Sequence, residues 1–214
     1  MRVAVLFSGG KDSIFAAEVC RMSGWEVVLL TIMPEKHSTM FHYPNIKWCK
    51  KQAEAMGLPI LFAKPKKKGE ESELRAMKKA LAKIKVDGVA AGAIESEYQK
   101  ERVDRIAHEL GIKSFAPIWR TGSTLLSEQC EFLDTYVVAV AAEGLGEKEL
   151  CRKFDFGFVE HIKNLNPPIN PHLEGGEGET FVTNAPFFKK ELKISSWKTH
   201  FEGSSGVAEI VSIA

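Results

Sequence analysis

The chain has 214 residues, of which 44% are hydrophobic and 27% charged, and its formal net charge is +1. This is an ordinary composition for a compact globular protein, and the small net charge gives no overall electrostatic basis for binding nucleic acid or an anionic membrane. No apolar run approaches the ~20 residues of a membrane-spanning helix, and the N-terminal apolar run is too short for a signal peptide, so we expect a cytoplasmic protein.

The first two thirds of the chain alternate between short apolar runs and amphipathic segments. The apolar runs predict buried strands at 3–7, 27–33, 59–63, 88–91 and 113–116. Apolar residues at helical spacing predict helices at 12–23, 46–56, 72–85 and 98–110. Strands buried on both faces and separated by helices are typical of a doubly wound, mostly parallel sheet in a three-layer α/β fold. The loops that follow such strands meet at one edge of the sheet, where ligands bind.

The last third of the chain has a different character. Residues 135–142 predict a strand, 147–162 a partly helical segment, and 164–180 a loop rich in proline and glycine. Two β-like runs at 191–202 and 206–214 flank a Gly-Ser-Ser turn and predict a terminal hairpin. We therefore divide the chain into an α/β domain at 1–125 and a small α+β part at 126–214.

Two further features have ordinary interpretations. The cysteines, Cys20, Cys49, Cys130 and Cys151, form no CxxC pair and are expected to be buried free thiols. The basic run at 64–68 is followed at once by two glutamates, so it is either a solvated loop or a contact surface for a nucleic acid or an acidic partner.

The sequence Phe7-SGGKDS joins the first predicted strand to the first predicted helix. A helix N-terminus binds anions, and Gly9 and Gly10 let the backbone approach phosphate oxygens closely. Ser8 and Ser13 add hydroxyl groups, and Lys11 adds a positive charge. The spacing fits neither the P-loop nor the dinucleotide fingerprint. A carboxylate beside phosphates indicates a cation, so we predict Asp12 as an Mg²⁺ ligand; the alternative is a tight turn with Asp12 as helix cap.

Three other stretches carry candidate site residues. In the helix after the fourth strand, Gln99 falls on the inward stripe, with Glu95 and Arg102 beside it. Three glutamates at 174, 177 and 179 stand among glycines, which indicates either a bound cation or a flexible acidic loop. Trp119 follows the fifth strand and is either a ligand contact or a core residue.

The SGGKDS loop resembles that of the PP-loop (N-type) ATP pyrophosphatases, the adenine nucleotide alpha hydrolase-like superfamily. In order along the chain, GAIESEYQKER at 92–102, PIW at 117–119, LGEKEL at 145–150 and EGGEGET at 174–180 resemble segments of one branch, the diphthine–ammonia ligase family. The resemblance implies that ATP is cut between its α and β phosphates. It also implies that AMP is transferred to an oxygen of the acceptor.

The family further implies that the carboxylate of diphthine on translation elongation factor 2 is adenylated and then amidated by ammonium, with release of AMP and pyrophosphate. Its implied catalytic residues here are Lys11, Asp12, Gln99, Arg102, Glu174, Glu177 and Glu179, the three glutamates holding or deprotonating ammonium. ATP and Mg²⁺ would be bound by Phe7, Ser8, Gly9, Gly10, Lys11, Asp12, Ser13, Thr31, Ile32, Met33, Gly92, Ala93 and Ile94. The acceptor would be bound by Glu95, Ser96, Tyr98, Gln99, Arg102, Trp119 and Gly176.

The chain departs from the family pattern at three places. His172-Leu173 stands where the family often has Cys-Gly, and Gly178 where an aromatic residue is usual. His37-Ser38 replaces an Asp-Ser pair ahead of Met40, Phe41 and His42. Two other functions stay open from the residues: a tRNA-modifying enzyme of the same superfamily, and an ATP-binding sensor without catalysis. Neither a membrane nor a nucleic acid is expected as a partner, and the sequence leaves a homo-oligomer open.

Overall fold

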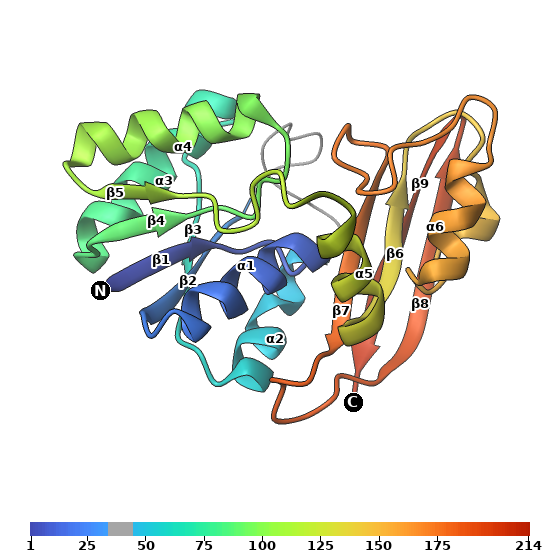
Figure 1. Cartoon of the computed structure of the whole chain (residues 1–214), viewed down its shortest axis with the longest axis horizontal. Helices are drawn as coiled ribbons and strands as arrows, with labels where there is room; N and C mark the ends of the chain where they lie inside the picture. The colour runs from blue at the N-terminus through green and yellow to red at the C-terminus, as the bar shows by residue number, and fades with distance from the viewer. Residues whose placement is uncertain (34–44) are drawn as a thin grey trace.

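The computed structural model describes residues 1–33 and 45–214 (Figure 1). The departure at His37-Ser38 and the segment Met40 to His42 lie outside the described residues. Among the helices that are described, none is both long and apolar enough to cross a membrane.

The N-terminal part is built on a five-stranded sheet whose adjacent strands are all parallel. Its strands are β1 Arg2–Leu6, β2 Glu26–Ile32, β3 Ile60–Ala63, β4 Gly88–Ala90 and β5 Lys113–Phe115, in the order β3-β2-β1-β4-β5. The chain winds outward from β1 to β3 and then returns to place β4 on the other side of β1. The predicted doubly wound sheet is therefore confirmed, and its switch point lies between β1 and β4.

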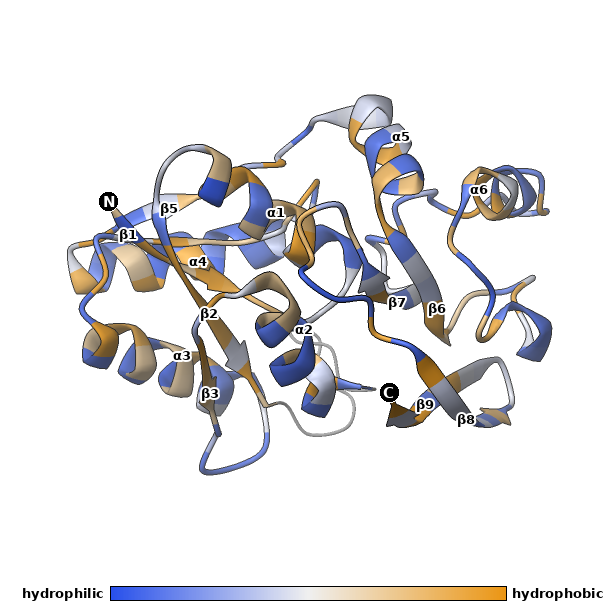
Figure 2. Ribbon diagram, turned by 90° about the horizontal axis from the view of Figure 1, so that it is seen from below, coloured by the Kyte–Doolittle hydropathy of each residue, from blue (hydrophilic) through white to orange (hydrophobic). Residues whose placement is uncertain are grey.

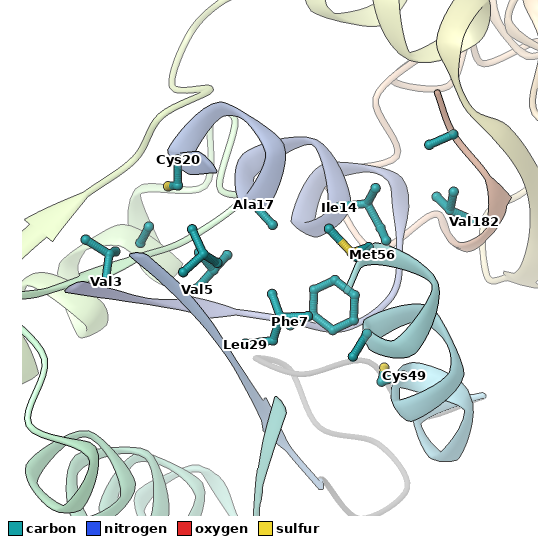
Figure 3. Packing of buried hydrophobic residues seen from close by; sticks show 14 of the residues in the cluster. Val3, Val5, Phe7, Ile14, Ala17, Cys20, Leu29, Cys49, Met56 and Val182 are labelled. Carbon is teal, nitrogen blue, oxygen red and sulfur yellow. The ribbon is translucent and has the colours of Figure 1, made fainter. Parts of the chain in front are cut away.

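Helices cover both faces of this sheet and give the predicted three layers. On one face, α1 Lys11–Met22 and α2 Cys49–Met56 pack on β1 and β2, with a 3₁₀ turn at Ile46–Trp48 leading into α2. Figure 3 shows this core, in which Phe7, Ile14 and Met56 pack together and Val182 approaches from the C-terminal part. On the other face lie α3 Glu70–Ile84 and α4 Glu97–Leu110, which bury residues such as Met77 and Ile106.

The C-terminal part forms a second, antiparallel sheet. Its strands are β6 Asp134–Val140, β7 Gly178–Asn184, β8 Ile194–Glu202 and β9 Ser205–Ile213, in the order β7-β6-β9-β8. The predicted hairpin is β8 and β9. Helix α6 Phe156–Lys163 packs on this sheet through Phe158 and Ile162. The ribbon in Figure 2 shows α6 with apolar and polar faces, as expected for a helix that covers one side of a sheet.

Two elements were not predicted, and two of the cysteines are more exposed than expected. Helix α5 Gly122–Phe132 opens with Gly-Ser-Thr, which are weak helix formers, and the domain boundary drawn at residue 125 falls inside it. Strand β7 begins within the glycine-rich acidic segment, because pairing with β6 outweighs local propensity. Residues 147–149 and 156–163 are helical, which confirms the partly helical segment predicted at 147–162. Cys130 and Cys151 are half-buried, whereas Cys20 and Cys49 are buried, and all four thiols are free.

Candidate active site

A cavity of about 500 Å³ opens at the carboxyl ends of β1, β2 and β4, beside the switch point of the parallel sheet. Its volume is in the range of small-molecule sites, roughly 300–1,000 Å³. The wall combines apolar side chains such as Leu30, Ile32 and Val103 with the polar residues of the SGGKDS loop. The segment 172–180 of the C-terminal part closes the wall, so both parts of the chain build the cavity.

The SGGKDS loop is shaped by its own last serine. The Ser13 hydroxyl accepts hydrogen bonds from the Ser8 N–H at 3.3 Å and the Gly9 N–H at 3.1 Å, and it donates to the Gly10 carbonyl at 3.0 Å. Gly9 has a φ of +83°, the left-handed region that favours glycine. The N-cap residue of α1, Gly10, makes no side-chain hydrogen bond, and the Lys11 N–H that follows it is bonded to Thr180 Oγ1. The positive end of the helix dipole faces the loop and favours an anion there.

The same loop is held from outside by a helix and by the second sheet. The Gln52 side-chain amide donates to the carbonyls of Gly9 and Val182, both at 2.8 Å. The Lys11 N–H donates to Thr180 Oγ1 at 3.1 Å, and the Val182 N–H donates to the Gly9 carbonyl at 3.1 Å. Strand β7 therefore acts as a brace for the loop. Our sequence interpretation missed Gln52, although a glutamine between the inward-facing Cys49, Ala53 and Met56 is a polar residue on an apolar stripe.

Lys11, which is buried, and Asp12, which is partly exposed, form an ion pair at the start of α1. Lys11 is 1% exposed, and its Nζ lies 2.9 and 2.8 Å from the two carboxylate oxygens of Asp12. The same Nζ donates to the His172 carbonyl at 2.7 Å. The Gln129 amide donates to Asp12 Oδ1 at 2.8 Å. Asp12 thus stands in the cavity wall with its carboxylate fixed by two neighbours.

The donor set fits a magnesium ion that arrives with its substrate. Among the described residues no group of three His, Cys, Asp or Glu side chains could hold a metal by itself. Mg²⁺ is commonly bound by one or two carboxylates together with substrate phosphates, and the Asp12 carboxylate lies next to the loop predicted to bind phosphates. A single hard oxygen ligand at this place is what such a site requires.

The three predicted glutamates separate in the structure. Glu174 accepts hydrogen bonds from the N–H groups of Ile94 and Glu95 at 3.4 and 3.3 Å, and burial, followed by the charge of Asp12, raises its pKa. Glu179 also lies in the cavity wall. The Glu177 carboxylate instead turns back on its own loop and accepts from the Gly175 N–H at 2.7 Å. The acidic segment therefore contributes Glu174 and Glu179 to the cavity wall.

Thirteen of the predicted site residues line the cavity, and ten do not. The wall contains Phe7, Ser8, Gly10, Lys11, Asp12, Ser13, Ile32, Gly92, Ser96, Gln99, Glu174, Gly176 and Glu179. Outside it lie Gly9, Thr31, Met33, Ala93, Ile94, Glu95, Tyr98, Arg102, Trp119 and Glu177. Thr31 is excluded because side chains alternate along β2: Leu30 and Ile32 face the cavity, while Thr31 donates to the Phe7 carbonyl at 2.8 Å.

Tyr98 and Arg102 belong to a separate cluster between α3 and α4. Both donate to the carboxylate of Glu70, at the start of α3, and these bonds lower the pKa of Glu70. The Arg102 guanidinium lies 3.2 Å from the centroid of the Tyr98 ring. Trp119 is likewise flanked by two cations, Lys100 at 5.9 Å and Arg120 at 5.5 Å from its ring.

Two departures from the family pattern meet at one place in the cavity wall. Leu173 has a φ of +59°, a conformation that favours glycine and that costs a leucine about 1–2 kcal/mol. Its side chain is buried, and its Cδ1 would lie 3.3 Å from a Cβ placed on Gly178. A larger residue at 178 would meet Leu173 and, at the shorter distance of 2.8 Å, the carbonyl oxygen of Ala139. His172, the neighbour of Leu173, is also buried in the cavity wall. Its burial and, to a smaller extent, the positive charge of Lys11 lower the pKa of its imidazole.

A parallel sheet with this loop at its switch point defines a nucleotide-binding α/β protein of the PP-loop type. Comparison with family models is more specific: residues 1–114 match the diphthamide synthase N-terminal domain and residues 121–213 match the diphthamide synthase C-terminal domain. The chain belongs to the diphthamide synthase family and is a ligase. The family resemblance stated from the sequence is therefore confirmed, and membership of this ligase family implies the use of ATP.

Similar proteins agree with this assignment. The chain is 31% identical to a diphthine–ammonia ligase of Danio rerio, over 98% of this chain and 92% of that protein. It is 29% identical to a diphthine–ammonia ligase of Homo sapiens, over 98% of this chain and 89% of that protein. A crystal structure described as a predicted subunit of tRNA methyltransferase from Methanocaldococcus jannaschii matches with a TM-score of 0.50 and 20% identity, over 89% of this chain and 99% of that one, which shows likeness of fold alone.

Proposed function

We propose that this protein is a diphthine–ammonia ligase. It would amidate the carboxylate of diphthine on translation elongation factor 2 with ammonium and form AMP and pyrophosphate from ATP. The observation that carries the proposal is that the SGGKDS loop and the carboxylates Glu174 and Glu179 share one cavity. The names of the similar proteins support the acceptor and the nitrogen source. A cytoplasmic location follows from this acceptor, which works in translation.

The proposed reaction has two steps. In the first, a carboxylate oxygen of the acceptor attacks the α-phosphorus of ATP, and the bond between that phosphorus and the bridging oxygen to the β-phosphate breaks. Pyrophosphate leaves, and an acyl-adenylate remains. The Lys11 side chain and the positive end of the α1 dipole stabilise the negative charge that develops on the leaving pyrophosphate. Asp12 would hold Mg²⁺, which neutralises phosphate charge when it is bound.

In the second step, the nitrogen lone pair of ammonia attacks the acyl carbon, the carbon–oxygen bond to AMP breaks, and the new amide nitrogen loses one proton to the phosphate oxygen of the leaving AMP. Ammonium must first lose a proton. Glu174 is suited to accept it, because a carboxylate with a raised pKa is a better base near neutral pH. Glu179, in the same wall, adds a second negative group that attracts ammonium.

The acceptor side is divided between the cavity and the surface around it. Ser96 and Gln99 line the cavity, and we assign them to the acceptor group itself. Glu95 is exposed, and Tyr98, Arg102 and Trp119 lie outside the wall, so we assign these four to the protein that carries the acceptor. Residues 1–125 would bind the nucleotide, and 126–214 would complete the acceptor side.

The decisive experiment measures AMP formation from ATP, ammonium and Mg²⁺ with elongation factor 2 that carries diphthine. The same factor without the modification is the control. AMP formation only with diphthine, together with the mass change for replacing a hydroxyl by an amide, would support the proposal. ATP binding without AMP formation on the modified factor would refute it and favour a different acceptor, such as a tRNA base.

A further inference from the structure

We propose that Gln129 is a positioning residue for Asp12: it holds the carboxylate in the orientation that binds the cation accompanying ATP. The proposal rests on the part of the proposed function that concerns ATP and Mg²⁺, and it does not depend on the acceptor. Gln129 was absent from the residues predicted from the sequence, and it does not line the cavity.

The contact between Gln129 and Asp12 joins distant parts of the chain. Gln129 lies on α5, 117 residues after Asp12, and its Nε2 donates to Asp12 Oδ1 at 2.8 Å. The glutamine is fully buried, with 0% exposure. Because an ionised carboxylate accepts hydrogen bonds and cannot donate them, the amide must present its N–H to Asp12. The contact therefore fixes the orientation of both side chains.

Lys11 also contacts Asp12, but it serves a different purpose. Its ammonium group is bonded to both carboxylate oxygens and neutralises their charge. If the Lys11 ammonium group turns towards phosphate oxygens, it loses its bonds to Asp12. The Gln129 amide is uncharged and is not attracted to phosphate in this way, so it keeps its hydrogen bond to Asp12. Gln129 thus keeps Asp12 oriented while leaving its full negative charge for a cation. A carboxylate fixed in this way loses less freedom when it binds the metal.

Stability alone does not explain the residue. Gln129 Oε1 is buried and has no hydrogen-bond partner among the residues that the structure describes. An unpaired buried oxygen is unfavourable, and an apolar side chain of similar size would avoid it. The neighbouring buried residues of α5, Leu125 and Leu126, are apolar. The amide is accounted for by what its N–H does for Asp12.

The test is the substitution Gln129→Met, which keeps the volume and removes the donor. The primary measurement is binding of Mn²⁺ in the presence of a non-hydrolysable ATP analogue, followed by electron paramagnetic resonance. We expect the Mn²⁺ affinity to fall about 10- to 100-fold, the usual effect of losing a partner of a metal ligand. The Tm without nucleotide should stay at the wild-type value, because the lost hydrogen bond is offset by removal of the unpaired oxygen. Ser127→Ala, on the exposed side of the same helix, is the matched control and should change neither quantity.

Unchanged Mn²⁺ affinity in Gln129→Met would overturn the proposal. So would an affinity loss matched by a large fall in Tm, because that result marks a structural residue. Should Gln129→Met fail to fold, Gln129→Asn replaces it: it keeps a buried amide that is one methylene too short to reach Asp12, and the same loss of affinity is expected. If the wild type binds Mn²⁺ with the analogue yet makes no AMP with diphthine, the proposed acceptor fails and this inference stands.

Discussion

Replacing Gly92 by alanine tests how the SGGKDS loop is held in place. A Cβ on Gly92 would lie 2.8 Å from the carbonyl carbon and oxygen of Asp12 and 2.9 Å from the Ser13 nitrogen. These are backbone atoms of the first turn of α1, so no side-chain rotation relieves the contact. Ordinary contact begins at 3.4 Å, so α1 and the end of β4 must separate by several tenths of an ångström. Overpacking of this kind costs about 1–3 kcal/mol, which corresponds to a Tm decrease of roughly 2–12 °C.

The expected loss of activity is larger than the loss of stability. Misplacing reacting groups by about 1 Å costs on the order of 100-fold in rate, so Gly92→Ala should lower AMP formation about 10- to 100-fold. Steady-state assays and calorimetry measure the two effects. Gly146→Ala is the control: its φ is −145°, which any residue adopts, and the nearest atom to its Cβ is 3.8 Å away. Wild-type AMP formation by Gly92→Ala would show that this close approach does not position the loop.

Three further substitutions have distinct expected results. Lys11→Met should keep the fold, because methionine fills the volume, and should lower AMP formation about 10²- to 10³-fold; near-normal turnover would remove Lys11 from phosphate binding. Glu174→Gln should raise the Tm at pH 8, because burial raises the pKa of Glu174 and the folded protein therefore loses stability when this carboxyl ionises. Melting curves at decreasing pH should show that the gain in Tm disappears below the ordinary glutamate pKa of about 4.3. A gain in Tm that does not depend on pH would contradict this cause. Thr180→Val should leave the buried Lys11 N–H without its acceptor and cost about 1–3 kcal/mol in urea unfolding, while Thr180→Ser should retain wild-type stability; equal effects would show that the hydroxyl is not the acceptor that matters.

The elements of the parallel sheet could be predicted because their cause is local. The run at 3–7 and strand β1 Arg2–Leu6 differ by one residue at each end, since a strand buried on both faces is apolar along its whole length. The helix after the SGGKDS loop and the end of α2 at Gly57, which has a φ of +69°, are also local features. The position of the loop at the carboxyl edge of the sheet follows from these elements and from the handedness of the crossovers.

The rest of the candidate site and of the fold depends on contacts between residues that are far apart in the sequence. A helical wheel places Gln99 inward but cannot show that Arg102, one turn further along, meets Glu70 of another helix. Gln129 and Thr180 contact the SGGKDS loop from 117 and 169 residues away, and nothing in their own sequence neighbourhood indicates those contacts. Strand β7 is stabilised by pairing with β6, which composition does not reveal. Local periodicity therefore predicted the strands of the parallel sheet and the position of the SGGKDS loop. Tertiary contacts determine which side chains reach the cavity.

The brace between β7 and the SGGKDS loop has a consequence for protein synthesis. The loop is synthesised before strand β7, yet its Gly9 carbonyl is bonded to the Val182 N–H and its Lys11 N–H to Thr180. A nascent chain that has emerged only as far as β5 contains every strand of the parallel sheet but lacks the strand that supports the loop. The wall of the cavity and the bonds that hold the loop are therefore complete only after residue 182 has emerged.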